Sequence, residues 1–376
     1  MHFITLDEFQ QLFSAPIPTF ANFKRNAVVK TSSRVVPLKE YIQGKKVVEE
    51  DLKNIHQFIV HKHEYLARFY KMSLRLVDIT QLQNEIHMPS SELSNNKLNN
   101  YKNIVRNMYY DHILEKTQSG IGGIPTYWSV LWGLIEKNEI DYKILTPSSL
   151  FYIRTNRMSG VLSSLFFRSS IMNPYFVYSL YFATKMKTRQ TRIFSPTLGW
   201  SSYMMGFLST NQVSHYVGTD VIPIVCKKTA QFAKEYFPEV NVDIYCTPSE
   251  ELRANKAFIT KYKHFFNIIF FSPPYYDMET YDGKLQSVAR YTSYEEWLNK
   301  YWEKTIQLCQ LVLAPGGKMI YIISDYGDYP LVKDMNAITT KYFKIIKKQK
   351  MLNRNVHVTS DSHRETGEWI FTFTII

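Results

Sequence analysis

The residues best placed to do chemistry directly follow a strongly apolar run. The run Phe265–Phe271 is typical of a buried strand, and Ser272, Pro273, Pro274 and Tyr275 come after it. Two consecutive prolines cannot donate to a β-ladder and they fix the backbone, so the strand ends and a hydroxyl, a carbonyl and an aromatic ring share one rigid corner. Such a corner, at the polar end of a strand in an α/β protein, suits an extruded nucleobase.

A second polar segment lies about 70 residues earlier, after the expected strand 192–195. It contains Pro196 and Gly199, and it leads into an expected helix whose free N–H groups favour a carboxylate. The next expected strand, 214–219, is followed by Asp220, about 20 residues after the glycine, the spacing at which a carboxylate meets ribose hydroxyls in nucleotide-binding folds. The alternative for Asp220 is a helix N-cap before Ile222.

The Ser-Pro-Pro-Tyr sequence resembles the catalytic motif of the S-adenosylmethionine-dependent amino-methyltransferases of nucleic acids, (Asp/Asn/Ser)-Pro-Pro-(Tyr/Phe/Trp). In that family the motif follows the fourth strand of a Rossmann-like domain. The resemblance implies that Ser272 and the carbonyl of Pro273 accept amino protons, that Pro274 stiffens the turn and that Tyr275 stacks on the base. No metal is required for this chemistry.

The same resemblance predicts the cofactor-binding residues. They are Ser195, Pro196, Thr197, Gly199, Asp220, Ser249 and Asn173. The chain departs from the family by having Ser195 where an acidic residue is usual and Trp200-Ser201-Ser202 where further glycine is usual. Asn173, before Pro174, is also explained by helix capping alone.

The loop after the motif is polar and aromatic, and we expect it to cover the site. Within it Tyr276, Tyr281 and Arg290 are the predicted substrate-binding residues, because aromatic rings stack on bases and arginine contacts phosphate. An ordinary solvated loop is the alternative. A possible metal cluster at His61, His63 and Glu64 has no second group of ligands, so a surface helix is favoured there.

The composition favours a folded protein with an anionic partner. The chain has 376 residues, 45% of them hydrophobic, and 45 Lys and Arg against 33 Asp and Glu give a formal charge of +12. Nucleic acid is the expected partner, DNA before RNA, and a protein partner or a homodimer is left open. Three distant cysteines, no signal peptide and no membrane-spanning run indicate a soluble intracellular protein, cytoplasmic or nucleoid, from a cell or a virus.

The periodicity divides the chain into two parts. Residues 1–150 read as a mainly helical domain, with no strand pattern between residues 40 and 150, and we expect it to bind nucleic acid or a partner. Residues 151–376 read as an α/β domain of the class I methyltransferase type, with a Rossmann-like, mostly parallel sheet of seven strands. The strands are expected near 192–195, 214–219, 242–246, 267–272, 318–323, 342–351 and 369–376.

The activity expected from the resemblance is methyl transfer to an exocyclic amino group of a base. The order of the parts favours N6 of adenine in DNA, whereas the serine of the motif favours N4 of cytosine. The serine at position 195 and the tryptophan at position 200 support a rival, a subunit of this fold that does not catalyse and instead binds nucleic acid or supports a partner. An RNA methyltransferase is a further alternative.

Overall fold

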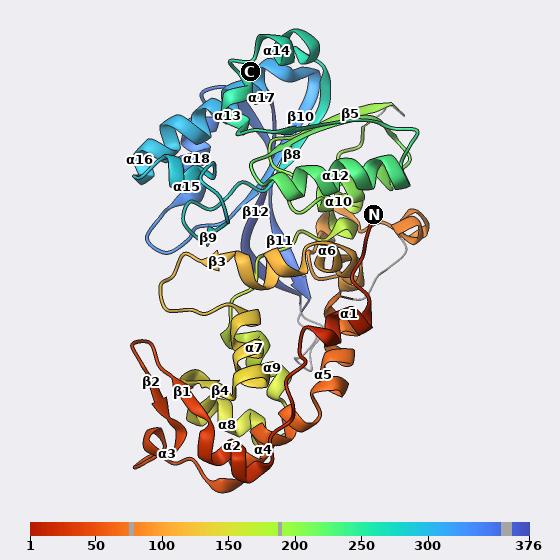
Figure 1. Cartoon of the computed structure of the whole chain (residues 1–376). Helices are drawn as coiled ribbons and strands as arrows, with labels where there is room; N and C mark the ends of the chain where they lie inside the picture. The colour runs from red at the N-terminus through yellow and green to blue at the C-terminus, as the bar shows by residue number, and fades with distance from the viewer. Residues whose placement is uncertain (75–78, 187–189, 355–362) are drawn as a thin grey trace. The chain divides into compact units, whose positions relative to one another are not determined.

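The computed structural model of the chain describes residues 1–74, 79–186, 190–354 and 363–376. It contains two compact units (Figure 1). The first unit comprises residues 76–108 and 171–376 together with Met1, and the second comprises residues 2–75 and 109–170. The chain thus divides differently from the single boundary predicted at residue 150.

A seven-stranded sheet forms the centre of the first unit. Its order is β11-β12-β10-β8-β5-β6-β7. All its neighbouring strands are parallel except those at β12, which is antiparallel to both β10 and β11. The strands are β5 (Thr191–Ser195), β6 (Val213–Asp220), β7 (Asn241–Cys246), β8 (Phe266–Phe271), β10 (Leu313–Ile323), β11 (Phe343–Arg354) and β12 (His363–Ile375). The predicted fold class and the seven predicted strands are confirmed.

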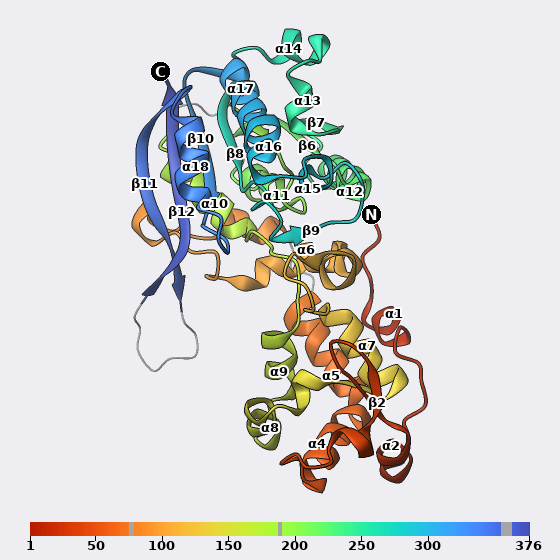
Figure 2. The ribbon, with the colours of Figure 1, turned by 90° about the vertical axis from the view of Figure 1, so that its left-hand side faces the viewer.

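The strand order places the polar corner where the sheet changes direction. From β5 the chain adds β6 and β7 on one side, and it then returns to add β8 and β10 on the other. The loops after β5 and β8 therefore diverge from neighbouring carboxyl ends, which is where open α/β sheets bind ligands. Figure 2 shows β11 as the outer strand beside β12.

Helices cover both faces of the sheet, which explains why β8 is apolar on both sides. The Phe270 ring contacts Tyr203 and Phe207 of one layer, whereas the adjacent Phe271 contacts Trp302 of the other. Figure 1 shows α10 and α12 on one side and α16 and α18 on the other. The first layer contains α10 (Pro174–Ala183), α11 (Ser202–Leu208) and α12 (Pro223–Tyr236). Besides the strands of the large sheet, the elements that follow β7 are α13 (Ser249–Leu252), α14 (Lys256–Tyr262), β9 (Glu279–Thr280), α15 (Ser287–Arg290), α16 (Tyr294–Trp297), the π-helical η7 (Leu298–Trp302), α17 (Glu303–Val312) and α18 (Leu331–Thr339).

Gly206 lets α10 and α11 approach closely, and we expect Gly206→Ala to destabilise the first unit. A Cβ atom there would lie 2.5 Å from the Pro174 carbonyl oxygen and 2.5 Å from the Val177 Cβ. Overpacking of this kind costs about 1–3 kcal/mol, which exceeds the gain in helix propensity of about 1 kcal/mol. Chemical denaturation should show the loss. Gly160→Ala, on an exposed helix position whose nearest atom is 4.0 Å away, is the control and should be neutral or stabilising.

The segment 79–108 belongs to the sheet unit because it packs on α10. The Met88 N–H donates to the Ser179 hydroxyl over 3.0 Å, and the Tyr175 hydroxyl donates to the Ile86 carbonyl over 2.6 Å. The segment forms short turns and one helix, η2 (Ile79–Asn84), η3 (Ser90–Glu92), η4 (Asn99–Tyr101) and α6 (Lys102–Met108). A single boundary at residue 150 places this segment with the helical domain, although the segment belongs to the sheet unit.

The second unit is mainly helical around an aromatic core that includes Phe9, Phe13 and Trp128. It also holds a three-stranded sheet, β2-β1-β4. The expectation of no strand between residues 40 and 150 was wrong at β3 and β4, which at two and three residues are too short to show an alternating pattern. The elements are α1 (Leu6–Gln11), α2 (Phe20–Asn26), β1 (Val28–Lys30), β2 (Val35–Pro37), α3 (Leu38–Tyr41), α4 (Glu49–Val60), α5 (Lys62–Phe69), η1 (Tyr70–Leu74), η5 (His112–Lys116), β3 (Gln118–Ser119), α7 (Tyr127–Lys137), β4 (Glu139–Asp141), η6 (Tyr142–Leu145), α8 (Pro147–Arg154) and α9 (Met158–Leu165).

The described ranges contain neither a membrane-spanning helix nor a metal-binding cluster. None of the helices there has both the length and the apolar character needed to cross a bilayer. The same residues contain no group of three or more His, Cys, Asp or Glu side chains placed to hold a metal ion. His61 and Glu64 are exposed and contact each other at 3.2 Å, so this part of the chain is a surface helix as predicted.

Candidate active site

The loop after β5 is shaped by three consecutive residues with positive φ. Gly199, Trp200 and Ser201 have φ angles of 51°, 57° and 64°. The ring of Tyr203 lies against Gly199, where a Cβ atom would come within 2.2 Å of the ring. Glycine is therefore required here by its conformation and by its contact. The Trp200 side chain is buried, and its ring centroid lies 5.9 Å from that of Tyr281.

Two hydroxyl groups connect this loop region to the turn after β8. The Thr197 hydroxyl donates to the Ser272 carbonyl over 3.4 Å, and the Tyr203 hydroxyl accepts from the Ser272 N–H over 3.2 Å. Burial raises the pKa of Tyr203 to about 12, so its phenol stays protonated at neutral pH. The two predicted parts of the site are thus held together through backbone atoms of Ser272.

Asp220 stands at the carboxyl end of β6, and backbone groups orient its carboxylate. One oxygen accepts from the Leu198 N–H at 3.1 Å, and the other accepts from the Ile222 N–H at 3.1 Å. Burial raises the pKa of Asp220, and these N–H groups oppose the rise. The side chain is partly exposed, and each oxygen can accept a second hydrogen bond. The N-cap of α12 is Ile222 without a side-chain cap bond, so helix capping does not account for Asp220.

The side chains of the Ser-Pro-Pro-Tyr turn contact residues of two other strands, β10 and β12. The Ser272 hydroxyl donates to the Ile322 carbonyl of β10 over 3.3 Å. The Tyr275 hydroxyl lies 3.3 Å from the same carbonyl and 3.3 Å from Glu368 Oε1 of β12. Pro273 is buried, while Ser272, Pro274 and Tyr275 are each partly exposed. The turn therefore presents polar atoms at the carboxyl edge of the sheet.

Several predicted cofactor residues have side chains enclosed by protein. Ser195 and Pro196 are buried, and the Ser249 hydroxyl pairs with the Thr305 hydroxyl at 3.0 Å. Asn173 is fully buried, caps α10 by accepting from the Tyr175 N–H, and donates to the Lys97 carbonyl over 2.8 Å. The capping alternative for Asn173 is confirmed. Any ligand contact from Ser195 would have to come from its backbone.

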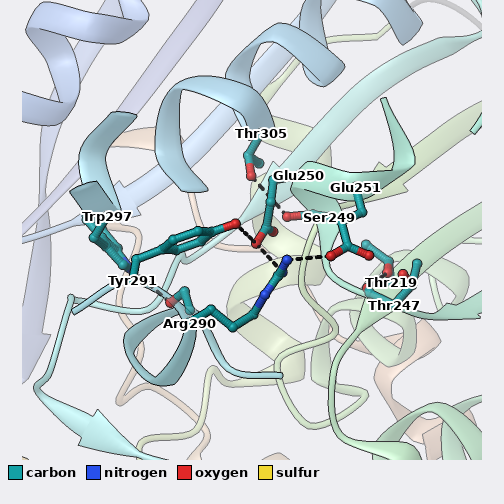
Figure 3. A network of polar contacts seen from close by, with 10 residues as sticks. Thr219, Thr247, Ser249, Glu250, Glu251, Arg290, Tyr291, Trp297 and Thr305 are labelled. Carbon is teal, nitrogen blue, oxygen red and sulfur yellow. Dashed lines mark hydrogen bonds and ion pairs between the residues drawn. The ribbon is translucent and has the colours of Figure 1, made fainter. Parts of the chain in front are cut away.

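Arg290 is held by two glutamates rather than pointing to open solvent (Figure 3). Its guanidinium contacts Glu250 Oε1 at 2.7 Å and also pairs with Glu251. The Tyr291 hydroxyl donates to the same Glu250 oxygen over 3.2 Å. Burial raises the pKa of Glu250, and Arg290 opposes that rise. These contacts give Arg290 a structural role in fixing the segment after the motif against α13.

The two predicted substrate tyrosines differ in their surroundings. Tyr276 is buried among the rings of Tyr294, Trp297 and Tyr329, with centroids 4.8–5.7 Å away, so its ring belongs to an aromatic core. Tyr281 is partly exposed and its hydroxyl donates to Glu279 over 2.7 Å. Its position near Trp200 places Tyr281 beside the loop after β5.

Sequence reasoning missed two residues that contact the turn. Tyr203 comes four residues after Gly199, a spacing that brings a helical side chain back over a preceding turn, so its position could have been inferred. Glu368 lies 93 residues beyond Tyr275, on a strand whose partner cannot be identified from local sequence. No local signal marks Glu368.

Comparison with known proteins gives only distant structural similarity. No family model matches the chain, and no curated protein matches it. Solved structures similar to part of it include TrmN from Thermus thermophilus, at 11% identity and a TM-score of 0.38 over 54% of this chain and 49% of that one. An rRNA methylase from Streptococcus thermophilus has 12% identity and a TM-score of 0.34 over 55% and 99%. An S-adenosylmethionine-dependent O-methyltransferase from Thermotoga maritima has 13% identity and a TM-score of 0.37 over 56% and 68%.

Similarity this low identifies neither the substrate nor the mechanism of this chain. The fold class of the first unit is therefore assigned from its strand order. Five parallel strands with a change of direction between β5 and β8, followed by an antiparallel strand inserted next to the edge, define the sheet. The fold class of the first unit is that of the class I, Rossmann-like methyltransferases.

Proposed function

We propose that the chain transfers a methyl group from S-adenosylmethionine to an exocyclic amino group of a base in nucleic acid, first N6 of adenine in DNA and next N4 of cytosine. The observation that carries this proposal is the pair of contacts from Thr197 and Tyr203 to the Ser272 backbone. They fix the Ser-Pro-Pro-Tyr turn to the cofactor loop, and transfer between two bound molecules needs such fixed geometry.

The residues around the loop after β5 fit S-adenosylmethionine. The partly exposed carboxylate of Asp220 has acceptor capacity beyond its two backbone bonds and suits ribose hydroxyls. The backbone between Gly199 and Ser202 turns into α11 and suits the carboxylate of a methionine moiety. S-adenosylmethionine, when bound, supplies a methyl group activated by a sulfonium.

The turn after β8 supplies acceptors for the amino group of the base. An exocyclic amino group is a weak nucleophile because its lone pair is delocalised into the ring, so the protein must hold the nitrogen in line with the methyl group. Ser272 Oγ and the Pro273 carbonyl are the proposed acceptors. The partly exposed ring of Tyr275 is the proposed stacking surface.

Lysines of the sheet unit support an anionic partner. Lys344, Lys347 and Lys348 are exposed on β11. Partial burial lowers the pKa of Lys347, and the charges of Lys185 and Lys318 lower it further. Because these cations lie close enough to repel one another, binding of a negatively charged phosphate backbone beside them is favourable. Arg192 of β5 lies over the Phe265 ring at 4.5 Å, and the nearby Lys187 and Arg189 lie outside the described residues.

The experiment that tests the proposal is transfer of labelled methyl groups to duplex DNA, single-stranded DNA and RNA, followed by nucleoside digestion and mass spectrometry. N6-methyladenine or N4-methylcytosine would support the proposal and identify the base. Transfer to RNA alone would move the substrate from DNA to RNA. Methylation at a ring carbon or a hydroxyl would contradict the role given to Ser272.

Asp220→Asn is expected to weaken S-adenosylmethionine binding by roughly ten- to a hundredfold, because hydrogen bonds to a charged group contribute about 1.5–3 kcal/mol. Calorimetric titration measures the affinity. The matched control is Asp243→Asn on the adjacent strand β7, which also removes a charge but whose carboxylate contacts Lys261 at 2.9 Å. Equal affinities for the two variants would argue against a cofactor role for Asp220.

A second candidate function is that of a subunit that does not catalyse. The side chains in the loop after β5 favour it. The buried Trp200 and its contact with Tyr281 fill space beside Gly199 with side chains. If S-adenosylmethionine does not bind to the folded wild-type protein in the same titration, the non-catalytic function becomes the better one. Measurable binding without transfer to any nucleic acid would instead point to a different methyl acceptor.

A further inference from the structure

Polar groups from three strands converge beside Tyr275. Ser272 Oγ and Tyr275 Oη both lie 3.3 Å from the Ile322 carbonyl oxygen, and Tyr275 Oη is also 3.3 Å from Glu368 Oε1. A carboxylate accepts a hydrogen bond more strongly than a carbonyl does. Since Ser272 already donates to Ile322, the hydroxyl hydrogen of Tyr275 is best directed at Glu368.

The pKa of Glu368 is raised, because the effect of burying its carboxyl group exceeds the effect of the groups that lower the pKa. Burial raises its pKa, while the Tyr275 hydroxyl and the charge of Lys102 on α6 lower it. Lys102 is itself buried. The next residue, Trp369, points to the opposite face of β12, where Lys348 and Lys350 lie over its ring at 4.1 and 4.7 Å. The Tyr275 hydroxyl and the charge of Lys102 thus act against burial in setting the protonation of Glu368.

We propose that Glu368 is a positioning residue for methyl transfer: it orients the Tyr275 hydroxyl and places a negative charge beside the Ser272–Tyr275 turn. This inference rests on the proposed function. During transfer the lone pair of the amino nitrogen forms the new N–C bond as the methyl leaves sulfur, with the C–S electrons staying on sulfur, and the nitrogen then releases one proton to water. The nitrogen becomes more positive along this path, and a nearby carboxylate in a partly desolvated site favours that change.

The Glu368→Gln variant tests the charge, because glutamine keeps the size of the side chain and an acceptor for Tyr275. We expect kcat for methyl transfer to fall by roughly tenfold, with S-adenosylmethionine affinity and KM for DNA unchanged. In the wild type kcat should fall at acidic pH as Glu368 becomes neutral, and the variant should lack this decline. The matched control is Glu303→Gln, which should behave as wild type, since Glu303 accepts from the Tyr342 hydroxyl over 2.8 Å and lies outside the turn.

A readout that does not depend on activity is the pH dependence of thermal stability. The raised pKa of Glu368 means that its favourable contribution is present below the pKa of the unfolded chain and is lost as the pH rises through the folded pKa. Relative to Glu368→Gln, the wild type should therefore lose stability across that interval. A difference in melting temperature that stays constant with pH would show that Glu368 does not titrate as inferred and would overturn the proposal.

The interaction between Glu368 and Tyr275 gives a further test. This test can be made through Tyr275 even if the Glu368→Gln variant folds poorly. Tyr275→Phe keeps the ring and removes the hydroxyl, so it should lower kcat and move the acidic decline to higher pH, because the hydroxyl that lowers the pKa of Glu368 is lost. The double variant should lack the decline and should lower kcat little further than Glu368→Gln alone. Active wild type with a kcat and pH profile unchanged in Glu368→Gln would overturn the role of Glu368 and leave the proposed function intact. Wild type without any transfer to an amino group would overturn both.

Discussion

Gly199→Ala is expected to destabilise the sheet unit by about 3 kcal/mol, and to abolish measurable S-adenosylmethionine binding. The added Cβ would lie 2.2–2.7 Å from ring atoms of Tyr203, which is buried and packed against Phe270. Overpacking contributes about 1–3 kcal/mol, and the left-handed conformation contributes about 1–2 kcal/mol for a residue with a side chain. Moving Tyr203 would also break its hydrogen bond with Ser272.

Gly327→Ala separates these two contributions. Gly327 has a φ of 54°, close to the 51° of Gly199, but no atom lies within 4 Å of the place that an added Cβ would take. It should lose only the conformational part, about 1 kcal/mol, and keep its affinity for S-adenosylmethionine. Denaturant unfolding and calorimetric titration of both variants measure the effects. Similar losses in the two variants would mean that the contact with Tyr203 is unimportant.

Tyr275→Ala is expected to lower kcat for methyl transfer by roughly a hundredfold or more, while S-adenosylmethionine still binds. Base stacking on an aromatic ring contributes about 1–3 kcal/mol, and the variant also removes the hydroxyl that contacts Glu368. Ser272→Ala removes an amino-group acceptor and should lower kcat as well. Single-turnover transfer to DNA is the measurement.

Tyr342→Ala is the matched control for this experiment. Tyr342 is likewise partly exposed, and its hydroxyl also donates to a glutamate, Glu303, but on the helix α17. It should leave methyl transfer unaffected. Wild-type rates in both Tyr275→Ala and Ser272→Ala would remove the catalytic role of the Ser-Pro-Pro-Tyr turn, whatever the cofactor affinity.

The sheet was predictable because most of its strands are encoded locally. The strand β8 is a run of six residues without a charge, and β6 ends in an acid that local sequence identifies. The start of β10 was missed: it begins at Leu313 rather than near residue 318, and its register with β8 shifts between Leu313 and Lys318. Gly316 and Gly317 lie inside β10, at this irregularity in its pairing with β8.

The site was predictable only where it is contiguous in sequence. Gly199 and Ser272 follow strands and Asp220 ends one, so strand periodicity located all three at one edge of the sheet. Arg290 shows the limit of this reasoning, because its residue type suggested a phosphate contact while its neighbours Glu250 and Glu251 come from an earlier helix. Contacts between distant segments depend on packing that no local pattern specifies. The same reason explains why the predicted boundary placed residues 79–108 with the helical domain.

The insertion of β12 between β10 and β11 has a consequence for the order of assembly. During synthesis β10 and β11 emerge before β12, so both must leave an unpaired strand edge until β12 pairs with them. Non-local pairing of this kind slows folding, and it exposes edges that can join another chain. Glu368 reaches Tyr275 only when β12 has paired, so a nascent chain cannot have the complete polar cluster before that pairing forms.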